Sequence, residues 1–475
     1  MNIPRQGRSK EEVLAALQRF KAHDLDWKSG RVWAYVYDPG AEVHEVVQQA
    51  YLMFLTENAL DPTVFPSLLK LETEVVRMIA DLLRGDERVV GHVTSGGTES
   101  VLLAVKTARD KARAEHPDIT TPEIVLPMTA HASFHKAAHY FGLKPVVVPF
   151  DPQTFRADVE AMRRAITENT ILLVASAPCY SQGVIDPIEE IGALAQEKGL
   201  LFHVDACVGG IHLSFMRKMG YPVPNFDFTV PGVTSISADM HKYGYSAKGC
   251  STVLYRDKSL RRYQIYACTD TTAYTLINPT ILSSKSGGAL AGAWAILNYL
   301  GEEGYERIIR AVQEATQRLI EGVNSIDGLR VLGRPDMCMF SFTSDTINIY
   351  QLADVMRKRG WYLQPQFSTP LSPRNLHVSV NYGTVPGVEA MLADLRESVE
   401  EVKRMTPLDS AFIRAMIAEA LKDASPESFA KLASVAGIQG SDLPEDMAFI
   451  NEVLDALPDE VANLLLIEYF NDLYT

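Results

Sequence analysis

Lys242 is the residue of this chain whose surroundings most favour covalent chemistry. It stands in the segment SISADMHKYG, directly after a β-branched run and between His241 and Tyr243. Few other charges lie nearby, so partial desolvation and a cationic neighbour would lower the pKa of its amine and make it a usable nucleophile. A lysine is more often a solvated surface group, and the residue types alone leave both interpretations open.

A glycine pair offers a place for an anion. Gly96, Gly97 and Thr98 follow the apolar run VVGHV and open a helical pattern that continues through Val101–Ala112. Glycines let backbone N–H groups approach a phosphate, and the start of a helix favours negative charge. The segment matches neither a P-loop nor a dinucleotide fingerprint, and an ordinary glycine turn is the alternative.

Asp205 closes another apolar run, LLFHVDA. Strand alternation places His203, Asp205 and Cys207 on one face, so a metal site is conceivable, but partners with metal-ligand spacing are missing and we expect no metal. We favour the hypothesis that Asp205, held in a low dielectric, pairs with a cationic ring nitrogen and keeps it protonated. A carboxylate that caps a turn at the end of a strand is the simpler alternative.

These groups need a scaffold that brings the ends of several strands together. Between about residues 89 and 255, short β-branched runs alternate with helical patterns, which predicts an α/β fold with a mostly parallel sheet covered by helices. Ligands of such sheets bind beyond the carboxyl ends of the strands. The seven runs are VVGHVT, EIVLP, KPVVVPF, TILLVASA, LLFHVDA, TSISA and CSTVLY.

The pattern changes along the chain predict three units. Residues 1–60 form an N-terminal arm with helices, residues 61–301 a large α/β domain, and residues 302–475 a smaller α+β domain with an acidic helical tail. The supporting features are helices near 10–20, 41–57 and 68–83 and from 287 onward, strands near 329–332, 339–343 and 376–380, and breaks in the tail at Pro426, Gly437 and Pro458.

Composition narrows the classes of partner and compartment. The 475 residues are 47% hydrophobic and carry a formal net charge of −14, which argues against a nucleic-acid partner. No stretch approaches the roughly 18 to 20 apolar residues of a membrane helix, and the amino end lacks an apolar signal core, so we expect no transmembrane segment and a cytoplasmic protein. Five cysteines without a CxxC pair predict neither a disulfide framework nor a structural zinc site.

The order of these motifs resembles the fold-type-I pyridoxal 5'-phosphate (PLP) enzymes of the group II decarboxylase superfamily, and most of all the sphingosine-1-phosphate lyase family. The resemblance runs from about Ser29 to the carboxyl end. It implies PLP as cofactor and a homodimer with active sites at the subunit interface. The segments that carry it are NALDPTVFPSLLKLE, HVTSGGTES, AHASFHKAAHYFGL, GVIDPI, HVDACVGG and SADMHKYGYSAKG.

The resemblance also assigns roles to single residues. Lys242 would hold PLP as a Schiff base, Asp205 would pair with the pyridinium nitrogen, and His131 would stack on the ring. The expected contacts of the cofactor phosphate are Gly96, Gly97, Thr98 and His241, while Cys207 would lie against the other ring face and Ser176 near the phenolic side. Simpler roles are helix capping for His131, a buried structural position for His241 and core packing for Cys207.

The chemistry implied is cleavage of the C2–C3 bond of a phosphorylated sphingoid base, giving a long-chain aldehyde and phosphoethanolamine. Lys248 resembles the cation that holds the substrate phosphate, Tyr35 would assist from a neighbouring subunit, and Lys285 would add a further cation. A solvated surface position is the alternative for Lys248.

Two positions and one four-residue stretch depart from the family pattern, and they concern the substrate more than the cofactor. Asp61 stands where the family usually has His, Lys285 stands where it usually has Arg, and Asp270-Thr271-Thr272-Ala273 replaces a stretch with Trp and Gly. A lysine in place of arginine replaces a bidentate guanidinium with a single ammonium charge. An amino-acid decarboxylase of the same superfamily therefore remains the second hypothesis, and a catalytically inactive PLP-binding interaction protein the third.

Overall fold

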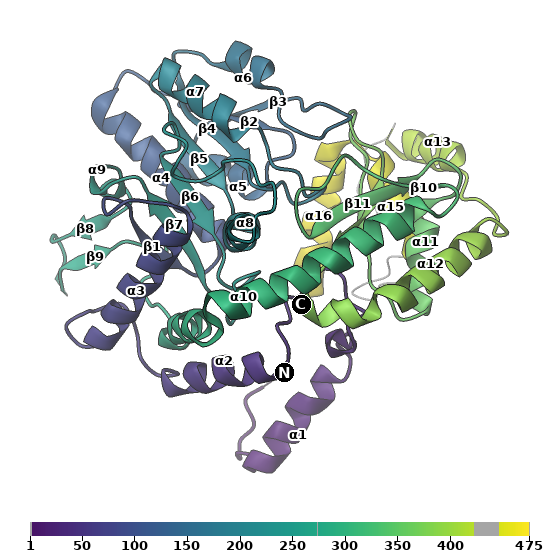
Figure 1. The fold of residues 1–475 in the computed structure, drawn as a ribbon, viewed down its shortest axis with the longest axis horizontal. Helices are drawn as coiled ribbons and strands as arrows, with labels where there is room; N and C mark the ends of the chain where they lie inside the picture. Colours follow the sequence, from purple (N-terminus) through teal and green to yellow (C-terminus); the bar gives the residue numbers. More distant parts are fainter. Residues whose placement is uncertain (1, 273, 422–445, 475) are drawn as a thin grey trace.

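A seven-stranded sheet forms the centre of the larger part of the computed structural model, which describes residues 2–272, 274–421 and 446–474 (Figure 1). Its order is β1-β7-β6-β5-β4-β2-β3, and only β7 runs antiparallel to its neighbours. The strands are β1 Val90–Thr94, β2 Glu123–Pro127, β3 Lys144–Val148, β4 Thr170–Ser176, β5 Leu201–Asp205, β6 Ser235–Ala238 and β7 Ser251–Tyr255. Each of the seven predicted runs is one of these strands, and the α/β class is confirmed.

Helices cover both faces of this sheet, so its central strands are buried on both sides (Figure 1). The helix after β1 illustrates the pattern, because it turns apolar residues such as Val101 and Val105 toward the sheet. The helices of this part are α3 Pro66–Leu82, α4 Gly97–Glu115, α5 Ser133–Phe141, α6 Val159–Ala165, α7 Ile188–Lys198, α8 Gly209–Lys218 and the short α9 Lys258–Arg261. A small hairpin of β8 Tyr266–Cys268 and β9 Leu276–Asn278 follows, which the sequence patterns had not indicated.

A four-stranded antiparallel sheet, ordered β10-β11-β13-β12, forms the second and smaller layer. Its strands are β10 Leu329–Val331, β11 Met339–Ser344, β12 Gln364–Gln366 and β13 Asn375–Ser379, and its helices are α11 Ile349–Lys358 and α12 Val388–Val402, the latter preceded by the 3-10 turn η2 Tyr382–Gly387. We predicted three of these strands and missed β12. It is three residues long, contains Pro365 and lies at the sheet edge, where a missing N–H is tolerated.

The long helix α10, Gly287–Asn324, runs from the large sheet to the small one (Figure 1). Its helical geometry is interrupted at Gly301, whose φ of 55° is accessible to glycine at little cost. The boundary that we placed between residues 301 and 302 falls at this break. The three-unit division itself stays a prediction.

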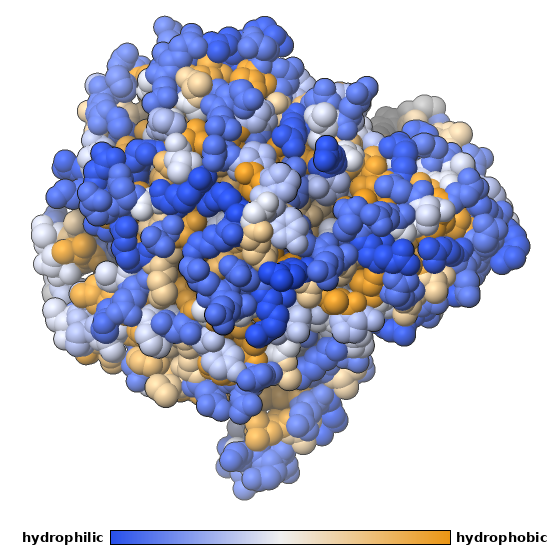
Figure 2. Space-filling view, in the orientation of Figure 1, coloured by the Kyte–Doolittle hydropathy of each residue, from blue (hydrophilic) through white to orange (hydrophobic). Residues whose placement is uncertain are grey.

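The amino-terminal segment contains α1 Lys10–Lys21, the 3-10 turn η1 Trp27–Ser29 and α2 Ala41–Met53. A capping box between Ser9 and Glu12 begins α1. No residue of α1 is buried, and the helix projects from the body with apolar side chains in view (Figures 1 and 2).

The carboxyl-terminal tail contains α13 Ser410–Leu421, α15 Ala448–Ala456 and α16 Asp459–Leu473. Pro458 directly precedes α16, as the predicted break requires, while Pro426 and Gly437 lie outside the described residues. Within the described ranges, no helix is both long and apolar enough to cross a membrane.

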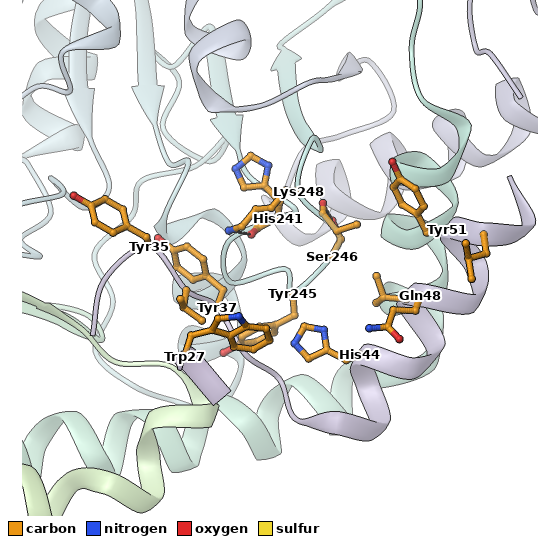
Figure 3. A pocket seen from close by; sticks show the side chains of 14 residues that line it. Trp27, Tyr35, Tyr37, His44, Gln48, Tyr51, His241, Tyr245, Ser246 and Lys248 are labelled. Carbon is orange, nitrogen blue, oxygen red and sulfur yellow. Dashed lines mark hydrogen bonds between the residues drawn. The ribbon is translucent and has the colours of Figure 1, made fainter. Parts of the chain in front are cut away.

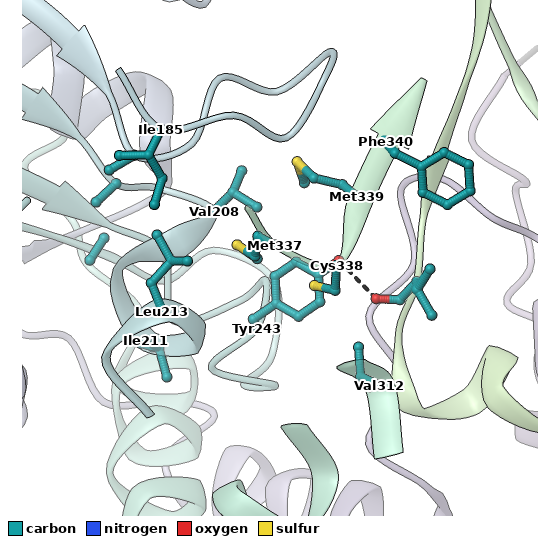
Figure 4. Packing of buried hydrophobic residues seen from close by; sticks show 14 of the residues in the cluster. Ile185, Val208, Ile211, Leu213, Tyr243, Val312, Met337, Cys338, Met339 and Phe340 are labelled. Carbon is teal, nitrogen blue, oxygen red and sulfur yellow. Dashed lines mark hydrogen bonds between the residues drawn. The ribbon is translucent and has the colours of Figure 1, made fainter. Parts of the chain in front are cut away.

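The core continues from the large sheet to the small one through Tyr243, the residue after Lys242 (Figure 4). Tyr243 is buried beside Cys338 and donates its hydroxyl proton to the carbonyl oxygen of Val380 at 2.9 Å. Its ring meets His212 and Tyr37 edge to face, with centroids 5.1 and 5.0 Å apart. Packing of this ring therefore fixes the loop that carries Lys242.

A buried carboxylate links the carboxyl-terminal ends of helices α3 and α8. Asp227 is fully buried, accepts Arg84 Nε at 2.8 Å after α3, and pairs with Arg217 Nη1 at 2.8 Å near the end of α8. The hydroxyl of Thr229 donates a further hydrogen bond at 2.7 Å. Removing this one carboxylate would leave two guanidinium groups without their counter-ion.

We expect Asp227→Ala to lower the free energy of unfolding by about 3–5 kcal/mol, the usual cost of breaking a buried ion pair. The control is Glu389→Ala, which removes the partner of Arg318 at the exposed surface and should change the unfolding midpoint far less, because solvent screens an exposed ion pair. Urea denaturation followed by circular dichroism, with both variants prepared in the same way, measures the two effects. Equal midpoints for the two variants would contradict the assignment.

Candidate active site

A cavity of about 370 Å³ lies at the carboxyl ends of the parallel strands. Its wall contains every residue that the sequence predicted for the cofactor, although these residues come from five separate segments. The lining residues are Ser95, Gly96, Gly97, Thr98, Glu99, His131, Ser133, Ser176, Pro178, Tyr180, Asp205, Cys207, Val208, Asp239, His241 and Lys242.

The glycine pair forms a backbone wall of this cavity. Strand β1 ends at Thr94 and α4 begins at Gly97, so the first N–H groups of the helix face the cavity. A Cβ atom on Gly97 would lie 2.7 and 2.9 Å from the carboxylate oxygens of Asp239 and 2.9 Å from Cys207 Sγ. Only glycine fits there, and a phosphate suits the start of α4.

Asp205 reaches the cavity from the end of β5. Its Oδ1 accepts hydrogen bonds from the backbone N–H of Cys207 at 3.0 Å and from Ser237 Oγ at 3.3 Å. Both bonds go to the same oxygen, so the second carboxylate oxygen can face a cation in the cavity. This arrangement fits the ring nitrogen of PLP.

His203 lies beneath Asp205 and is fully buried. Its Nδ1 lies 2.8 Å from Ser235 Oγ and its Nε2 lies 3.2 Å from Ser237 Oγ. Burial lowers the pKa of this imidazole to about 4, so the ring is neutral at physiological pH. His203 thus supports the serine that binds Asp205, and both of its ring nitrogens already have partners.

His131, Cys207 and Ser176 border the cavity and also have local structural contacts. His131 Nδ1 accepts the backbone N–H of Ser133 at 3.2 Å, so this histidine caps the start of α5 and lines the cavity at the same time. Cys207 is buried, its Sγ lies 3.2 Å from Ser237 Oγ, and burial raises the pKa of the thiol well above its usual value. Ser176 ends β4, where its N–H bonds to the carboxylate of Asp186 at 2.8 Å.

Lys242 forms an ion pair that the sequence did not reveal. Its Nζ lies 3.0 Å from Oδ2 of the buried Asp239, and His241 Nε2 lies 3.5 Å from the same oxygen. Burial is the largest single influence and would lower the pKa of Lys242, but the acidic groups around it, Asp239 first among them, together outweigh burial and raise the pKa. Our expectation of a lowered pKa was therefore wrong. The available signal was an acidic residue at the end of a strand, three positions before the lysine.

A second cavity, of about 530 Å³, adjoins the first through His241 (Figure 3). Lys248 Nζ lies in it, 4.7 Å from the centre of the Tyr37 ring, and donates to the carbonyl oxygen of His241 at 3.2 Å. Burial and the nearby charge of Lys242 lower the pKa of Lys248 to about 8. The other lining residues are Trp27, Tyr35, Val36, His44, Val47, Gln48, Tyr51, Leu52, Tyr245, Ser246 and Ala247.

The aromatic residue beside Lys248 is Tyr37, which sequence reasoning had passed over in favour of Tyr35. Tyr37 is partly buried, and the loss of solvent around its hydroxyl raises the pKa of that group to about 12. The ring of Tyr35 points away from Trp27 and His44 (Figure 3), and its hydroxyl accepts a hydrogen bond from Gln364 Nε2 at 2.7 Å.

Of the positions that depart from the family pattern, those that the structure describes line neither cavity. Lys285 Nζ lies 2.6 Å from both carboxylate oxygens of Glu72, so the structure does not bring it to the predicted phosphate contacts. Asp61 is exposed and accepts the N–H and the hydroxyl of Thr63 at 2.8 and 2.6 Å. The stretch from Asp270 to Thr272 lies between β8 and β9, and Ala273 lies outside the described residues.

Comparison with known proteins agrees with this geometry. The family model described as pyridoxal-dependent decarboxylase conserved domain matches residues 13–344, and the one described as pyridoxal-dependent enzyme, C-terminal putative HTH domain, matches residues 387–472. Sphingosine-1-phosphate lyase of Arabidopsis thaliana is 45% identical over 400 residues, which cover 82% of this chain and 72% of that protein. Sphingosine-1-phosphate lyase 1 of Rattus norvegicus is 42% identical and covers 85% of this chain and 70% of the relative.

Solved structures show the same relationship. The Burkholderia pseudomallei sphingosine-1-phosphate lyase superposes with a TM-score of 0.81 at 39% identity, covering 90% of this chain and 97% of that one. The glutamate decarboxylase of Lactobacillus brevis has a TM-score of 0.76 at 20% identity over 86% and 96% of the two chains, which shows a common fold. The chain belongs to the sphingosine-1-phosphate lyase family, within the group of pyridoxal-dependent decarboxylases.

Proposed function

We propose that this protein is a PLP-dependent lyase that cleaves the C2–C3 bond of a phosphorylated sphingoid base into a long-chain aldehyde and phosphoethanolamine. The observation that carries the proposal is the adjacency of two cavities, one containing Lys242 and Asp205 and the other containing Lys248. The names of the relatives support the same reaction.

The first cavity fits PLP in charge and shape. The start of α4 and the bare backbone at Gly97 would hold the phosphate, Asp205 the ring nitrogen, and Lys242 the aldehyde carbon through a covalent bond. When bound, PLP supplies an electron sink that stabilises negative charge at the substrate carbon. Asp205 contributes by keeping the adjoining ring nitrogen protonated.

The second cavity fits the rest of the substrate. Lys248 and Tyr37 would bind the substrate phosphate through a cation and a phenol hydroxyl. Trp27, Val47 and Leu52 offer apolar surface for the aliphatic chain. The two cavities share His241, so the phosphate site begins next to the reacting carbons.

The reaction requires that a proton leave the C3 hydroxyl and that another reach C2. Lys242 lines the first cavity and would be free to carry a proton there once the substrate amine has taken its place. Asp239, at 3.0 Å, stabilises its charged form. We therefore assign proton transfer to Lys242 and its electrostatic support to Asp239.

The decarboxylase hypothesis receives less support from the geometry. It rested on Asp61, Lys285 and the stretch after Cys268, none of which lines either cavity. Like-charge repulsion between Asp61 and a substrate phosphate is therefore not expected within this chain.

We also propose a homodimer. Helix α1 has no buried residue, and its Val13, Leu14, Leu17 and Phe20 are exposed. A helix of this length gains most of its stability from packing, which a second subunit would supply.

We expect the purified PLP-loaded protein to release aldehyde from a phosphorylated sphingoid base and none from the unphosphorylated base, because Lys248 has no counter-charge in the latter. Amino acids should yield no carbon dioxide. Aldehyde trapping and carbon dioxide capture on the same preparation measure both products. Carbon dioxide from an amino acid, with no aldehyde from sphingoid phosphates, would leave only the cofactor assignment.

Asp205→Asn should reduce kcat by about 100- to 1000-fold, because a neutral amide no longer favours the protonated ring nitrogen. PLP affinity should change much less, since the phosphate and Lys242 remain. Spectroscopic PLP titration and steady-state rates separate the two effects. Ser237→Ala, which removes one donor to Asp205, is the milder control. Near-normal turnover in Asp205→Asn would show that another carboxylate serves the ring.

Lys248 gives the substrate affinity a predicted pH dependence. Its ammonium form is present below a pKa of about 8 and is lost as pH rises through that value. We expect the KM for the phosphorylated substrate to increase by up to about tenfold per pH unit above pH 8. In Lys248→Arg the KM should not change over this pH range, because guanidinium stays charged. Lys248→Met should raise the KM by about 10- to 100-fold at pH 7. Identical profiles for wild type and Lys248→Arg would refute this role.

A further inference from the structure

Three side chains connect the two cavities by hydrogen bonds. The hydroxyl of Tyr180 donates to Gln364 Oε1 at 2.8 Å, and Gln364 Nε2 donates to the hydroxyl of Tyr35 at 2.7 Å. Tyr180 lines the cavity of Lys242, and Tyr35 lines the cavity of Lys248. We call this set of three residues the tyrosine bridge.

The tyrosine bridge joins three parts of the chain that are distant in sequence. Tyr180 follows β4 of the large sheet, Gln364 begins β12 at the edge of the small sheet, and Tyr35 belongs to the segment between η1 and α2. Tyr180 is partly buried, whereas Tyr35 is 58% exposed. The bridge therefore runs from the interior of the site to the surface of this chain, which we take as its mouth.

Neighbouring residues of the small sheet fix the positions of Tyr180 and Gln364. The Tyr180 ring stacks on His377, with centroids 4.3 Å apart and planes 29° apart. His377 is buried, with Nδ1 2.9 Å from the carbonyl oxygen of Ser181 and Nε2 2.8 Å from Ser379 Oγ. In the sheet register His377 stands opposite Gln364, so one strand pair positions both the stacking partner and the amide.

The backbone at Tyr35 is strained. Its φ is 64°, and the N–H of Val36 bonds to the carbonyl oxygen of Ala34 at 2.8 Å, which makes Tyr35 the centre of a three-residue turn. A bulky residue rarely adopts this conformation, and it persists only where the surroundings hold it. The bond from Gln364 and the adjoining ring of Tyr362, 6.1 Å away, provide that hold.

We propose that Gln364 is a positioning residue that keeps the mouth of the substrate site narrow by holding Tyr180 and Tyr35 together. Since both hydroxyls are bonded within the bridge, the rings can border an aliphatic chain without leaving a polar group unpaired. This inference rests on the proposed function for the identity of the substrate. Loss of the amide would release the two tyrosine rings from each other and widen the mouth, while the backbone hydrogen bond between Trp33 and Tyr362 would still hold the amino-terminal segment to the small sheet.

The first test measures access to the bound cofactor and requires no substrate. Hydroxylamine attacks enzyme-bound PLP, and its second-order rate is followed by absorbance of the holoenzyme. Gln364→Leu removes both hydrogen bonds of the bridge and should raise this rate about 5- to 30-fold, the range for one to two neutral hydrogen bonds. Gln364→Glu should stay within about twofold of wild type, because a carboxylate accepts from both hydroxyls.

A matched control lies two residues along the same strand. Gln366→Leu removes the same kind of side chain, whose Oε1 accepts from Ser341 Oγ at 3.3 Å and which lines neither cavity. Its hydroxylamine rate should equal that of wild type. A rate for Gln364→Leu equal to wild type, or an equal increase in Gln366→Leu, would overturn the proposal.

A double-mutant cycle separates the bridge from general loosening. Tyr35→Phe keeps the ring and removes only the hydroxyl, so its effect and that of Gln364→Leu should not add in the double variant. With sphingoid phosphates, Gln364→Leu should raise KM about fivefold and leave kcat, PLP content and thermal midpoint close to wild type. Additive effects, or a fall in kcat with unchanged KM, would count against a positioning role. If wild type releases no aldehyde, the proposed function fails while the hydroxylamine result still judges the bridge.

Discussion

The ion pair between Lys242 and Asp239 is the constraint around which the rest of the site is arranged. Both groups are removed from bulk water, and an unpaired charge in such an environment would be costly. Their charged atoms lie 3.0 Å apart. Asp239 also excludes any side chain at position 97, because a Cβ there would meet its carboxylate. The same carboxylate therefore keeps the lysine charged and leaves the helix start bare for an anion.

The sheet could be predicted from short runs with strong local patterns. Several residues that line the first cavity, such as His131 and Ser176, were indicated only by the resemblance to a family. The residues that the sequence did not indicate are those whose roles depend on distant contacts. The role of Asp239 could be recognised only once its burial was known. Our prediction that the pKa of Lys242 is lowered was wrong, because a sequence shows apolar neighbours but not the distance to a carboxylate. Gln364 lies on a three-residue edge strand beside a proline, where no periodic signal exists.

The carboxyl-terminal match to a putative HTH domain raises the question of nucleic acid. Residues 387–472 contain 18 acidic and 6 basic residues, a charge that a phosphate backbone would repel. Described helices of this segment instead pack against the small sheet and its helices. Asp354 of α11 accepts the N–H groups of Met447 and Ala448 at the start of α15, and Arg374 pairs with the buried Glu452.

Tyr35 and Tyr37 show how a single backbone conformation links the phosphate site to the mouth. In a regular strand, residues two positions apart point to the same side. The positive φ at Tyr35 breaks that alternation, so Tyr37 packs against Tyr243 and Lys248 while Tyr35 reaches Gln364. Releasing Tyr35 would relax the turn that also directs Tyr37. The segment before α2 therefore couples the width of the mouth to the position of the phenol beside Lys248, which no reading of residue types alone could have indicated.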